Sequence, residues 1–334
     1  MRQLEKSWYR TDFASRLFCL LLWPVSLLFG ALAGVRRAGF RLGLLRTIRL
    51  PVPVVVIGNI TAGGTGKTPL TIALARSLKQ QQQRPGIVCR GYGGLARQPQ
   101  AVVADSDPRV TGDEAVLLAR HSGCPVWIGA DRVAAARGLL AANPGCNVLL
   151  SDDGLQHYAL GRDFEIAVID AARGFGNHRL LPAGPLREPL ARLASVDAVV
   201  LNGAGPVSRP ATSAYRMMLC GARFRNLASP QQYVSASYFA GRKTTAVAAI
   251  GNPQRFFDQL VSLGIAAQTR AFPDHYAYTA DDLALSAGSE IIMTDKDAVK
   301  CERFALPTYW ALEVAAELDG DLAGQIMRKL GVSQ

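Results

Sequence analysis

The chain has 334 residues, of which 49% are hydrophobic and 19% are charged, a balance that argues against intrinsic disorder and indicates a folded protein of two parts. Its formal net charge is +11, and residues 1–50 alone contribute +7 because they hold nine arginines and lysines against Glu5 and Asp12. These basic residues are not interleaved with stacking aromatics, and the six scattered cysteines form no CxxC pair, so nucleic-acid binding and a zinc site are both disfavoured.

The first predicted element is the apolar segment LFCLLLWPVSLLFGALAGV at residues 17–35, which contains no charged residue. Its nineteen residues approach the roughly 20 that cross a bilayer core. A signal peptide, a spanning helix and a buried core helix remain open, but export would remove the chain from cytosolic ATP and Pro24 weakens a span. We favour membrane contact and assign residues 1–49 to a membrane-associated N-terminal segment. A helix or helical hairpin in one leaflet, with the arginines of residues 36–50 at anionic headgroups, fits at least as well as a spanning helix.

The next element is a phosphate-binding loop between a strand and a helix. PVPVVVIGNI at residues 51–60 predicts a buried strand, and PLTIALARSLKQ at residues 69–80 places leucines at every fourth position of a helix. Backbone N–H groups of such a loop wrap phosphates, while Lys67 reaches the outer phosphates and the Thr68 hydroxyl reaches Mg²⁺. The general pattern has glycine where Thr61 stands, which is the one departure. The predicted nucleotide-binding residues are Thr61, Ala62, Gly63, Gly64, Thr65, Gly66, Lys67 and Thr68.

Acidic residues follow at two places. Asp152 and Asp153 end an apolar run, and carboxylates at the C-terminal edge of a strand are suited to face a bound Mg²⁺. Such a pair alone is typical of a turn, but a Gly-Lys-Thr loop in the same domain favours the metal site. Asp113 and Glu114, in TGDEAVLLARHSG, are well explained as capping acids of the helix that follows, and a catalytic role needs a more specific argument.

The pattern along the whole chain predicts an α/β fold. We expect a P-loop NTPase-like core with a mostly parallel sheet at residues 50–205, and a linker with short strands at residues 206–240. A smaller α/β domain at residues 241–334 follows, and its last helix is expected to pack back on the core. The sequence TDKD at residues 294–297 is similar to a guanine-reading loop, but a turn at the end of a strand explains it, and we assign it no role.

Six motifs occur in order between residues 58 and 276. They are GNITAGGTGKTP (58–69), RGYGG (90–94), GDE (112–114), DDGLQH (152–157), LLPAGPLREP (180–189) and FPDHY (272–276). Together they closely resemble the tetraacyldisaccharide 4'-kinases, which phosphorylate the membrane-bound disaccharide precursor of lipid A. The resemblance implies a kinase with ATP as phosphate donor, Mg²⁺ as cofactor and the 4'-hydroxyl of tetraacyldisaccharide 1-phosphate as acceptor. It further implies an enzyme associated with the cytoplasmic face of the bacterial inner membrane, in which a two-stranded linker joins the core to the smaller C-terminal domain. We expect a monomer with anionic lipid at its surface.

The resemblance also implies residue roles. Asp113 becomes the general base on the sugar hydroxyl, and His275, from the second domain, becomes its partner. The implied metal ligands are Thr68, Glu114, Asp152 and Asp153. The residues implied near the sugar and phosphates are Gln156, His157 and Arg187. Ala115 and His178 depart from the family pattern, which has proline and glycine there, and His178 puts the local loop shape in doubt.

Two other classes of function compete with the kinase. A membrane-associated dimerising ATPase of the deviant Walker type would carry a signature lysine where this chain has Ala62. A non-catalytic nucleotide-sensing scaffold would have no use for Asp113, Asp152 and His275. The kinase is therefore favoured, and the deviant Walker ATPase is the alternative.

Overall fold

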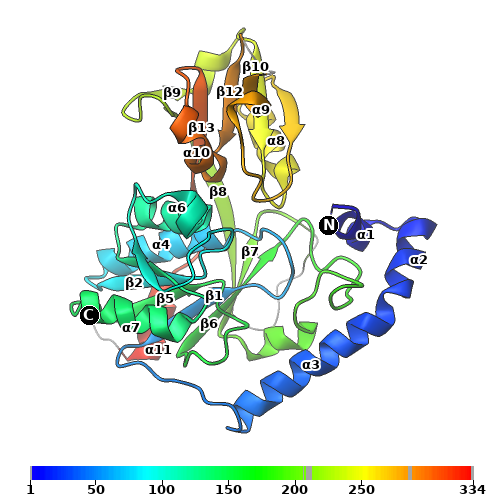
Figure 1. Ribbon diagram of the computed structural model, residues 1–334, viewed down its shortest axis with the longest axis vertical. Coiled ribbons are helices and arrows are strands. Elements are labelled where there is room, and N and C mark those ends of the chain that lie inside the picture. Colours follow the sequence, from blue (N-terminus) through cyan, green and yellow to red (C-terminus); the bar gives the residue numbers. More distant parts are fainter. Residues whose placement is uncertain (1, 206, 208–212, 285–287, 332–334) are drawn as a thin grey trace.

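The computed structural model describes residues 2–205, 207, 213–284 and 288–331. Figure 1 shows two lobes of unequal size, joined by long strands, with the N-terminal helices forming an arm along the larger lobe. One continuous sheet of thirteen strands runs through these described residues and both lobes.

The larger lobe is built on strands β1 to β7, in the order β7-β6-β1-β5-β2-β4-β3. The strands are β1 (Val54–Gly58), β2 (Pro85–Cys89), β3 (Gln100–Val102), β4 (Val126–Ile128), β5 (Val148–Asp152), β6 (Phe164–Asp170) and β7 (Ala198–Asn202). All pair in parallel except β3, which is antiparallel to β4. β1, β2, β5 and β7 are buried along their whole length, as expected of parallel strands covered on both faces.

Helices cover both faces of this part of the sheet. On one face lie α4 (Lys67–Gln80), α6 (Asp113–Ser122) and α11 (Leu322–Leu330), and α7 (Arg132–Ala142) lies on the other. The leucines that the sequence places on one face of α4 are buried in the first of these cores. The short helix α5 (Pro108–Thr111) precedes α6, and the 3₁₀ helix η1 (Leu190–Ser195) precedes β7.

The smaller lobe continues the same sheet in the order β11-β10-β12-β13-β8. Its elements are β9 (Tyr233–Ser235), η2 (Ala236–Phe239), β10 (Thr244–Ala248), α8 (Pro253–Ser262), β11 (Gln268–Ala271), α9 (Ala280–Ala284), β12 (Glu290–Thr294), α10 (Asp295–Cys301) and η3 (Glu302–Phe304). Phe256, Trp310 and Tyr278 anchor its two apolar clusters, one on each side of the strands. The expected α/β fold with a mostly parallel core sheet and a smaller α/β lobe is confirmed.

Two long antiparallel strands, β8 (Ala214–Asn226) and β13 (Tyr309–Leu318), connect the lobes. The sequence predicts only short strands in the linker, but β8 has 13 residues. It pairs with β7 at its start and with β13 along its length. After β13 the chain returns to the larger lobe, where α11 packs against α4 and β6. The lobes therefore share a two-stranded connection, as the family resemblance implies.

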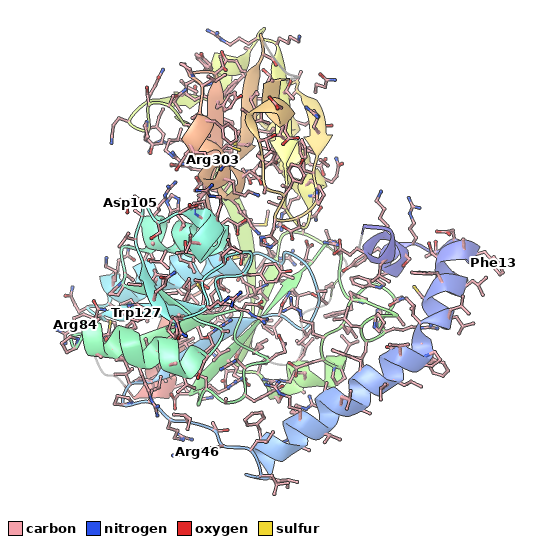
Figure 2. The ribbon with its side chains drawn as sticks, in the orientation of Figure 1. Phe13, Arg46, Arg84, Asp105, Trp127 and Arg303 are labelled. Carbon is pink, nitrogen blue, oxygen red and sulfur yellow. The ribbon has the colours of Figure 1, made fainter. Side chains whose placement is uncertain are left out.

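The N-terminal arm consists of α1 (Arg2–Tyr9), α2 (Phe13–Leu21) and α3 (Trp23–Arg41). Two hydrogen bonds attach it to the larger lobe: Trp8 Nε1 donates to the Pro182 carbonyl (3.0 Å), and Ser26 Oγ donates to the Leu180 carbonyl (2.7 Å). Most of its large apolar side chains are exposed, and Figure 2 shows Phe13 at its outer end. This exposure disagrees with the buried-core-helix alternative. Within the described residues, no single helix is long and apolar enough to cross a membrane; α2 and α3 pass only as a pair, bent by 50°.

Candidate active site

The phosphate-binding loop follows β1 and leads into α4, as its sequence predicts. Gly66 has a φ of 92°, and a Cβ at this position would overlap the amide of Asn202, so the loop requires glycine here. The same amide donates to the carbonyl of Thr65 (2.8 Å) and ties the loop to the end of β7. Lys67 and Thr68 form the first turn of α4, where free N–H groups and the helix dipole favour phosphate.

Asp152 and Asp153 lie at the C-terminal end of β5, beside this loop. Asp152 is buried and accepts hydrogen bonds from the hydroxyls of Thr68 (3.0 Å) and Thr71 (3.2 Å). Burial and the neighbouring Glu114 carboxylate raise the pKa of Asp152 to about 6. Ionisation of Asp152 therefore destabilises the folded state.

Asp153 has the opposite electrostatic environment. Its carboxylate lies 3.6 Å from Lys67 Nζ and 3.3 Å from Arg187 Nη1. Burial would raise the pKa of Asp153, but these two cations outweigh burial and hold the pKa at about 2. Its φ of 51° is unusual for a residue other than glycine, which indicates that the surrounding contacts fix this turn.

The predicted metal ligands offer suitable donors for Mg²⁺. Thr68, Asp152 and Glu114 supply hydroxyl and carboxylate oxygens, which hard cations prefer. A divalent cation among them would offset the repulsion that raises the pKa of Asp152. Within the described residues, no three His, Cys, Asp or Glu side chains form a metal cluster by themselves. The donor set therefore fits an Mg²⁺ ion that also binds substrate phosphates.

The structure brings Asp113 and His275 together from the two lobes. Asp113 is buried at the first residue of α6, and its Oδ2 lies 3.2 Å from His275 Nδ1. Burial would raise the pKa of Asp113, but Lys296, His275 and Lys300 outweigh burial and hold the pKa at about 2. His275 has a φ of 58°, and its backbone N–H donates to the Ala249 carbonyl at the end of β10. The Asp113 carboxylate is therefore ionised, and together with His275 it forms a pair that can accept a proton from a hydroxyl.

The RGYGG motif contacts the residues of this pair. A Cβ on Gly112, the residue before α6, would lie 2.6 Å from the Tyr92 carbonyl, so this position also requires glycine. The Tyr92 ring packs on the His275 ring with centroids 4.8 Å apart. RGYGG and FPDHY, which are far apart in the sequence, are thus in direct contact beside Asp113.

The three residues predicted near the sugar occupy different settings. Arg187 Nη1 lies 3.3 Å from both carboxylate oxygens of Asp153. Gln156 Nε2 donates to the Asn59 carbonyl (3.0 Å) and to Glu188 Oε1 (2.7 Å). His157 Nε2 is buried without a hydrogen-bond partner among the described residues, and burial and Arg132 lower the pKa of His157 to about 4. His157 is therefore a neutral side chain with a free polar atom, whereas Gln156 is already engaged.

Two residues at the site were not predicted from the sequence. Lys296 Nζ, from the TDKD segment, lies 2.9 Å from Glu114 Oε1 and 3.4 Å from His275 Nε2. Arg132 is buried at the start of α7; its Nη1 donates to the Gly129 carbonyl (2.8 Å), and its Nε has no partner among the described residues. The TDKD segment is a weak indication that Lys296 has a role. The sequence around Arg132 is that of an ordinary helix start and gives no indication for this residue.

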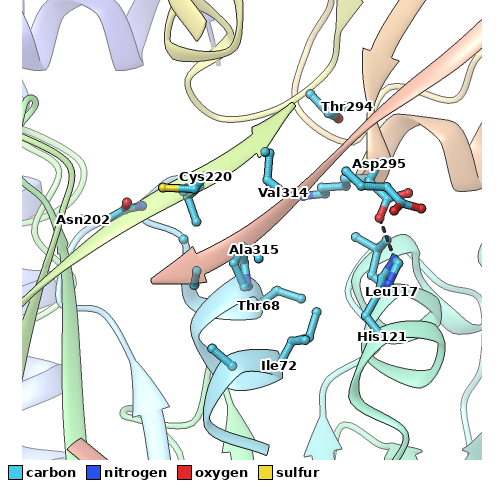
Figure 3. Close-up of a pocket in the computed structure, with 18 of the residues that line it drawn as sticks. Thr68, Ile72, Leu117, His121, Asn202, Cys220, Thr294, Asp295, Val314 and Ala315 are labelled. Carbon is cyan, nitrogen blue, oxygen red and sulfur yellow. Dashed lines mark ion pairs between the residues drawn. The ribbon is translucent and has the colours of Figure 1, made fainter. Parts of the chain in front are cut away.

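A cavity of about 640 Å³ opens beside the phosphate-binding loop and is lined by Lys67, Thr68, Glu114 and Lys296. Figure 3 shows Ile72 of α4 and Leu117 of α6 facing Val314 of β13 across this space. Its size is typical of small-molecule sites, and it combines apolar walls with a charged end. The cavity can therefore hold the base and sugar of a nucleotide whose phosphates reach the loop.

The strand, loop and helix with Lys67 and Thr68, facing an acidic cluster at the neighbouring strand end, define a P-loop nucleotide-binding protein of the phosphotransferase kind. The family model described as tetraacyldisaccharide-1-P 4'-kinase matches residues 18–331, and the chain belongs to this family.

Known relatives agree with this assignment. The tetraacyldisaccharide 4'-kinase of Methylobacillus flagellatus is 48% identical over 330 residues, covering 98% of this chain and 96% of the relative. That of Azoarcus sp. is 50% identical over 313 residues, covering 93% and 92%. The crystal structure of "apo" form LpxK from Aquifex aeolicus in complex with ATP superposes with a TM-score of 0.79 at 28% identity, covering 94% of this chain and 99% of that one. The family expected from the six motifs is confirmed.

Proposed function

We propose that this chain transfers the γ-phosphate of ATP to the 4'-hydroxyl of tetraacyldisaccharide 1-phosphate in lipid A biosynthesis. The observation that carries the proposal is the meeting of Asp113 and His275, from separate lobes, next to Glu114 and Lys296, which line the same cavity as Lys67 and Thr68. Water in hydrolysis and a hydroxyl in transfer both lose a proton, so the pair can serve either nucleophile; the six family motifs around it favour the hydroxyl of a lipid acceptor.

The proposed reaction is an in-line displacement at the γ-phosphorus. The sugar 4'-oxygen forms the new P–O bond, the bond to the ADP oxygen breaks, and the hydroxyl proton passes to the Asp113 carboxylate. Lys67 stabilises charge on the outer phosphates, and His275 orients Asp113. We assign the Mg²⁺ ligands to Thr68, Glu114 and Asp152, with Asp153 held close by Lys67; when bound, the ion neutralises phosphate charge.

We further propose that the chain is a monomer that works at the cytoplasmic face of the inner membrane, on anionic lipid. Exposed leucines on α2 and α3 and the arginines at the end of α3 support this location. Arg36 Nη1 also donates to the Gln156 carbonyl, so the basic end of the arm touches a residue of the DDGLQH motif. A lipid headgroup held at the arm would therefore be close to the residues assigned to the sugar.

The test uses purified full-length protein, tetraacyldisaccharide 1-phosphate in detergent micelles and ATP labelled at the γ-phosphate. Wild type should transfer label to the lipid, EDTA should stop transfer and added Mg²⁺ should restore it. Lys67→Ala should lower the rate by at least about 100-fold, because it removes a charge that the transition state needs. Lys79→Ala, at the other end of α4, is the matched control and should retain activity. Release of inorganic phosphate without labelled lipid would support the deviant Walker ATPase instead.

A further inference from the structure

Lys296 lies where a cation is not expected on local grounds. It is the second residue of α10, and the first turn of a helix favours acidic rather than basic side chains. Tertiary contacts compensate, because three acceptors surround its ammonium group. Nζ lies 2.9 Å from Glu114 Oε1, 3.5 Å from Asp274 Oδ1 and 3.4 Å from His275 Nε2. A conflict between local preference and tertiary setting is typical of functional residues.

The three contacts match the three donors of a lysine ammonium group, which has no acceptor capacity. A hydrogen bond from Lys296 to His275 requires the ring nitrogen Nε2 to be an acceptor without a proton. The proton of the neutral ring then lies on Nδ1, which faces Asp113 Oδ2 at 3.2 Å and donates to it. Asp274 Oδ1 lies 3.7 Å from Nε2, beyond hydrogen-bond distance, and so offers no acceptor that would favour the other tautomer.

The contact between Lys296 and Glu114 crosses the boundary between the two lobes. Glu114 follows Asp113 on α6 of the larger lobe, whereas Lys296 and His275 belong to the smaller lobe. The ammonium group of Lys296 forms ion pairs with Glu114 of the larger lobe (2.9 Å) and Asp274 of the smaller lobe (3.5 Å). A charged Lys296 thus joins the two lobes at the place where the base meets its histidine.

We propose that Lys296 is a positioning residue for phosphoryl transfer: it holds His275 in the tautomer that donates from Nδ1 to Asp113, and through Glu114 it fixes the distance between the two lobes at the base. The inference rests on the proposed kinase function. Lys296 acts through His275 and does not contact the reacting atoms.

The first test is a double-mutant cycle in the same micelle assay. Lys296→Met should lower kcat by about 10–100-fold while the KM values for ATP and lipid change by less than about threefold. In a His275→Ala background, Lys296→Met should cost less than about threefold, because its partner is already gone. Lys296→Arg, which keeps a charged donor, should recover part of the lost kcat.

Arg120→Met is the matched control for a purely structural role. It removes another ion pair between α6 and the smaller lobe, formed by Arg120 and Glu302 away from the base. This variant should keep kcat within about threefold of wild type if positioning of His275, rather than general contact between the lobes, is what Lys296 supplies. Thermal unfolding of each variant confirms that it is folded; if Lys296→Met is unfolded, the same cycle is run with Lys296→Gln, which removes the charge but keeps a polar side chain.

Four results would overturn the positioning role while leaving the proposed kinase function intact. Lys296→Met could cost the same factor with and without His275, or it could raise only the KM for ATP, which would make Lys296 a phosphate ligand. Arg120→Met could also lose as much kcat as Lys296→Met. Nitrogen NMR of labelled histidine, assigned with His275→Ala, could show the proton of wild-type His275 on Nε2. Absence of lipid label with wild type would refute the proposed function itself, and the positioning role would fall with it.

Discussion

Asp152 is the residue at which function and stability conflict most clearly. Burial and Glu114 raise its pKa to about 6, so ionising it penalises the folded state above that pH. Asp152→Asn should therefore stabilise the metal-free protein at pH 7.5 by about 1–3 kcal/mol and abolish phosphoryl transfer. Below about pH 4 the carboxyl is protonated in both folded and unfolded states, so the gain should vanish as the pH falls from 6 to 4. Denaturant unfolding at pH 7.5 and pH 4 measures this, and an equal gain at both pH values would contradict it.

Sequence reasoning reaches individual residues only where their chemistry is local. Lys67, Thr68 and the acidic pair follow from a loop and strand end whose physics is contained in a few residues. The pairing of Asp113 with His275 joins positions 162 residues apart, each with an adequate local explanation, so only the family resemblance suggested it. The TDKD segment shows the limit clearly: Thr294 does cap α10, as a strand-end turn implies, yet Lys296 beside it contacts the base pair.

At the scale of elements, apolar patterning predicts the buried strands of the core but not the strand that links the lobes. β8 contains arginines and a glycine and is only partly buried, so its sequence resembles a connector. Its extended form is stabilised by pairing with β7 and β13, which are distant in sequence. Such non-local hydrogen bonding leaves little trace in hydrophobic periodicity.

The contact between α6 and the smaller lobe should contribute to stability. Arg120 donates to both carboxylate oxygens of Glu302, at 2.5 and 2.7 Å, and both side chains are largely buried. Arg120→Met should lower the free energy of unfolding by about 1–3 kcal/mol and speed hydrogen exchange in α6 and α10. Arg109→Met, which removes an exposed pair with Asp107, should cost less than about 1 kcal/mol. Equal losses in the two variants would show that the Arg120 pair adds nothing beyond a surface contact.

At the scale of the whole molecule, the bent arm gives the protein a second surface beside the nucleotide site. Ser26 and Trp8 attach the arm to the backbone of Leu180 and Pro182, within the LLPAGPLREP motif. The same motif carries Arg187 and Glu188, which contact the acidic cluster and Gln156. The arm therefore contacts a motif that in turn contacts Asp153 and Gln156 of the site. The hydropathy of residues 17–35 favours membrane contact over a buried helix, but only the fold shows which side chains remain uncovered.

The exposed face of α3 should carry a large part of the membrane affinity. Leu28 and Leu32 are 61% and 63% exposed and lie one turn apart, so substituting both leaves the contacts of Ser26 and Trp8 intact. Burying a leucine in the membrane contributes about 1.5–3 kcal/mol, and a lysine there adds a penalty. Leu28→Lys combined with Leu32→Lys should therefore lower partitioning into anionic vesicles at least roughly tenfold, measured by flotation, without lowering the melting temperature.

Val261→Lys is the control for this last experiment, because Val261 is 71% exposed on α8 of the smaller lobe. It should float with vesicles as wild type does if the arm is the membrane contact. Equal loss in the control would mean that replacing any exposed apolar side chain weakens vesicle binding, so that the arm has no special part in it. Unchanged flotation of the double variant would instead move the contact to the basic residues 36–50, since these supply the other attraction to anionic lipid.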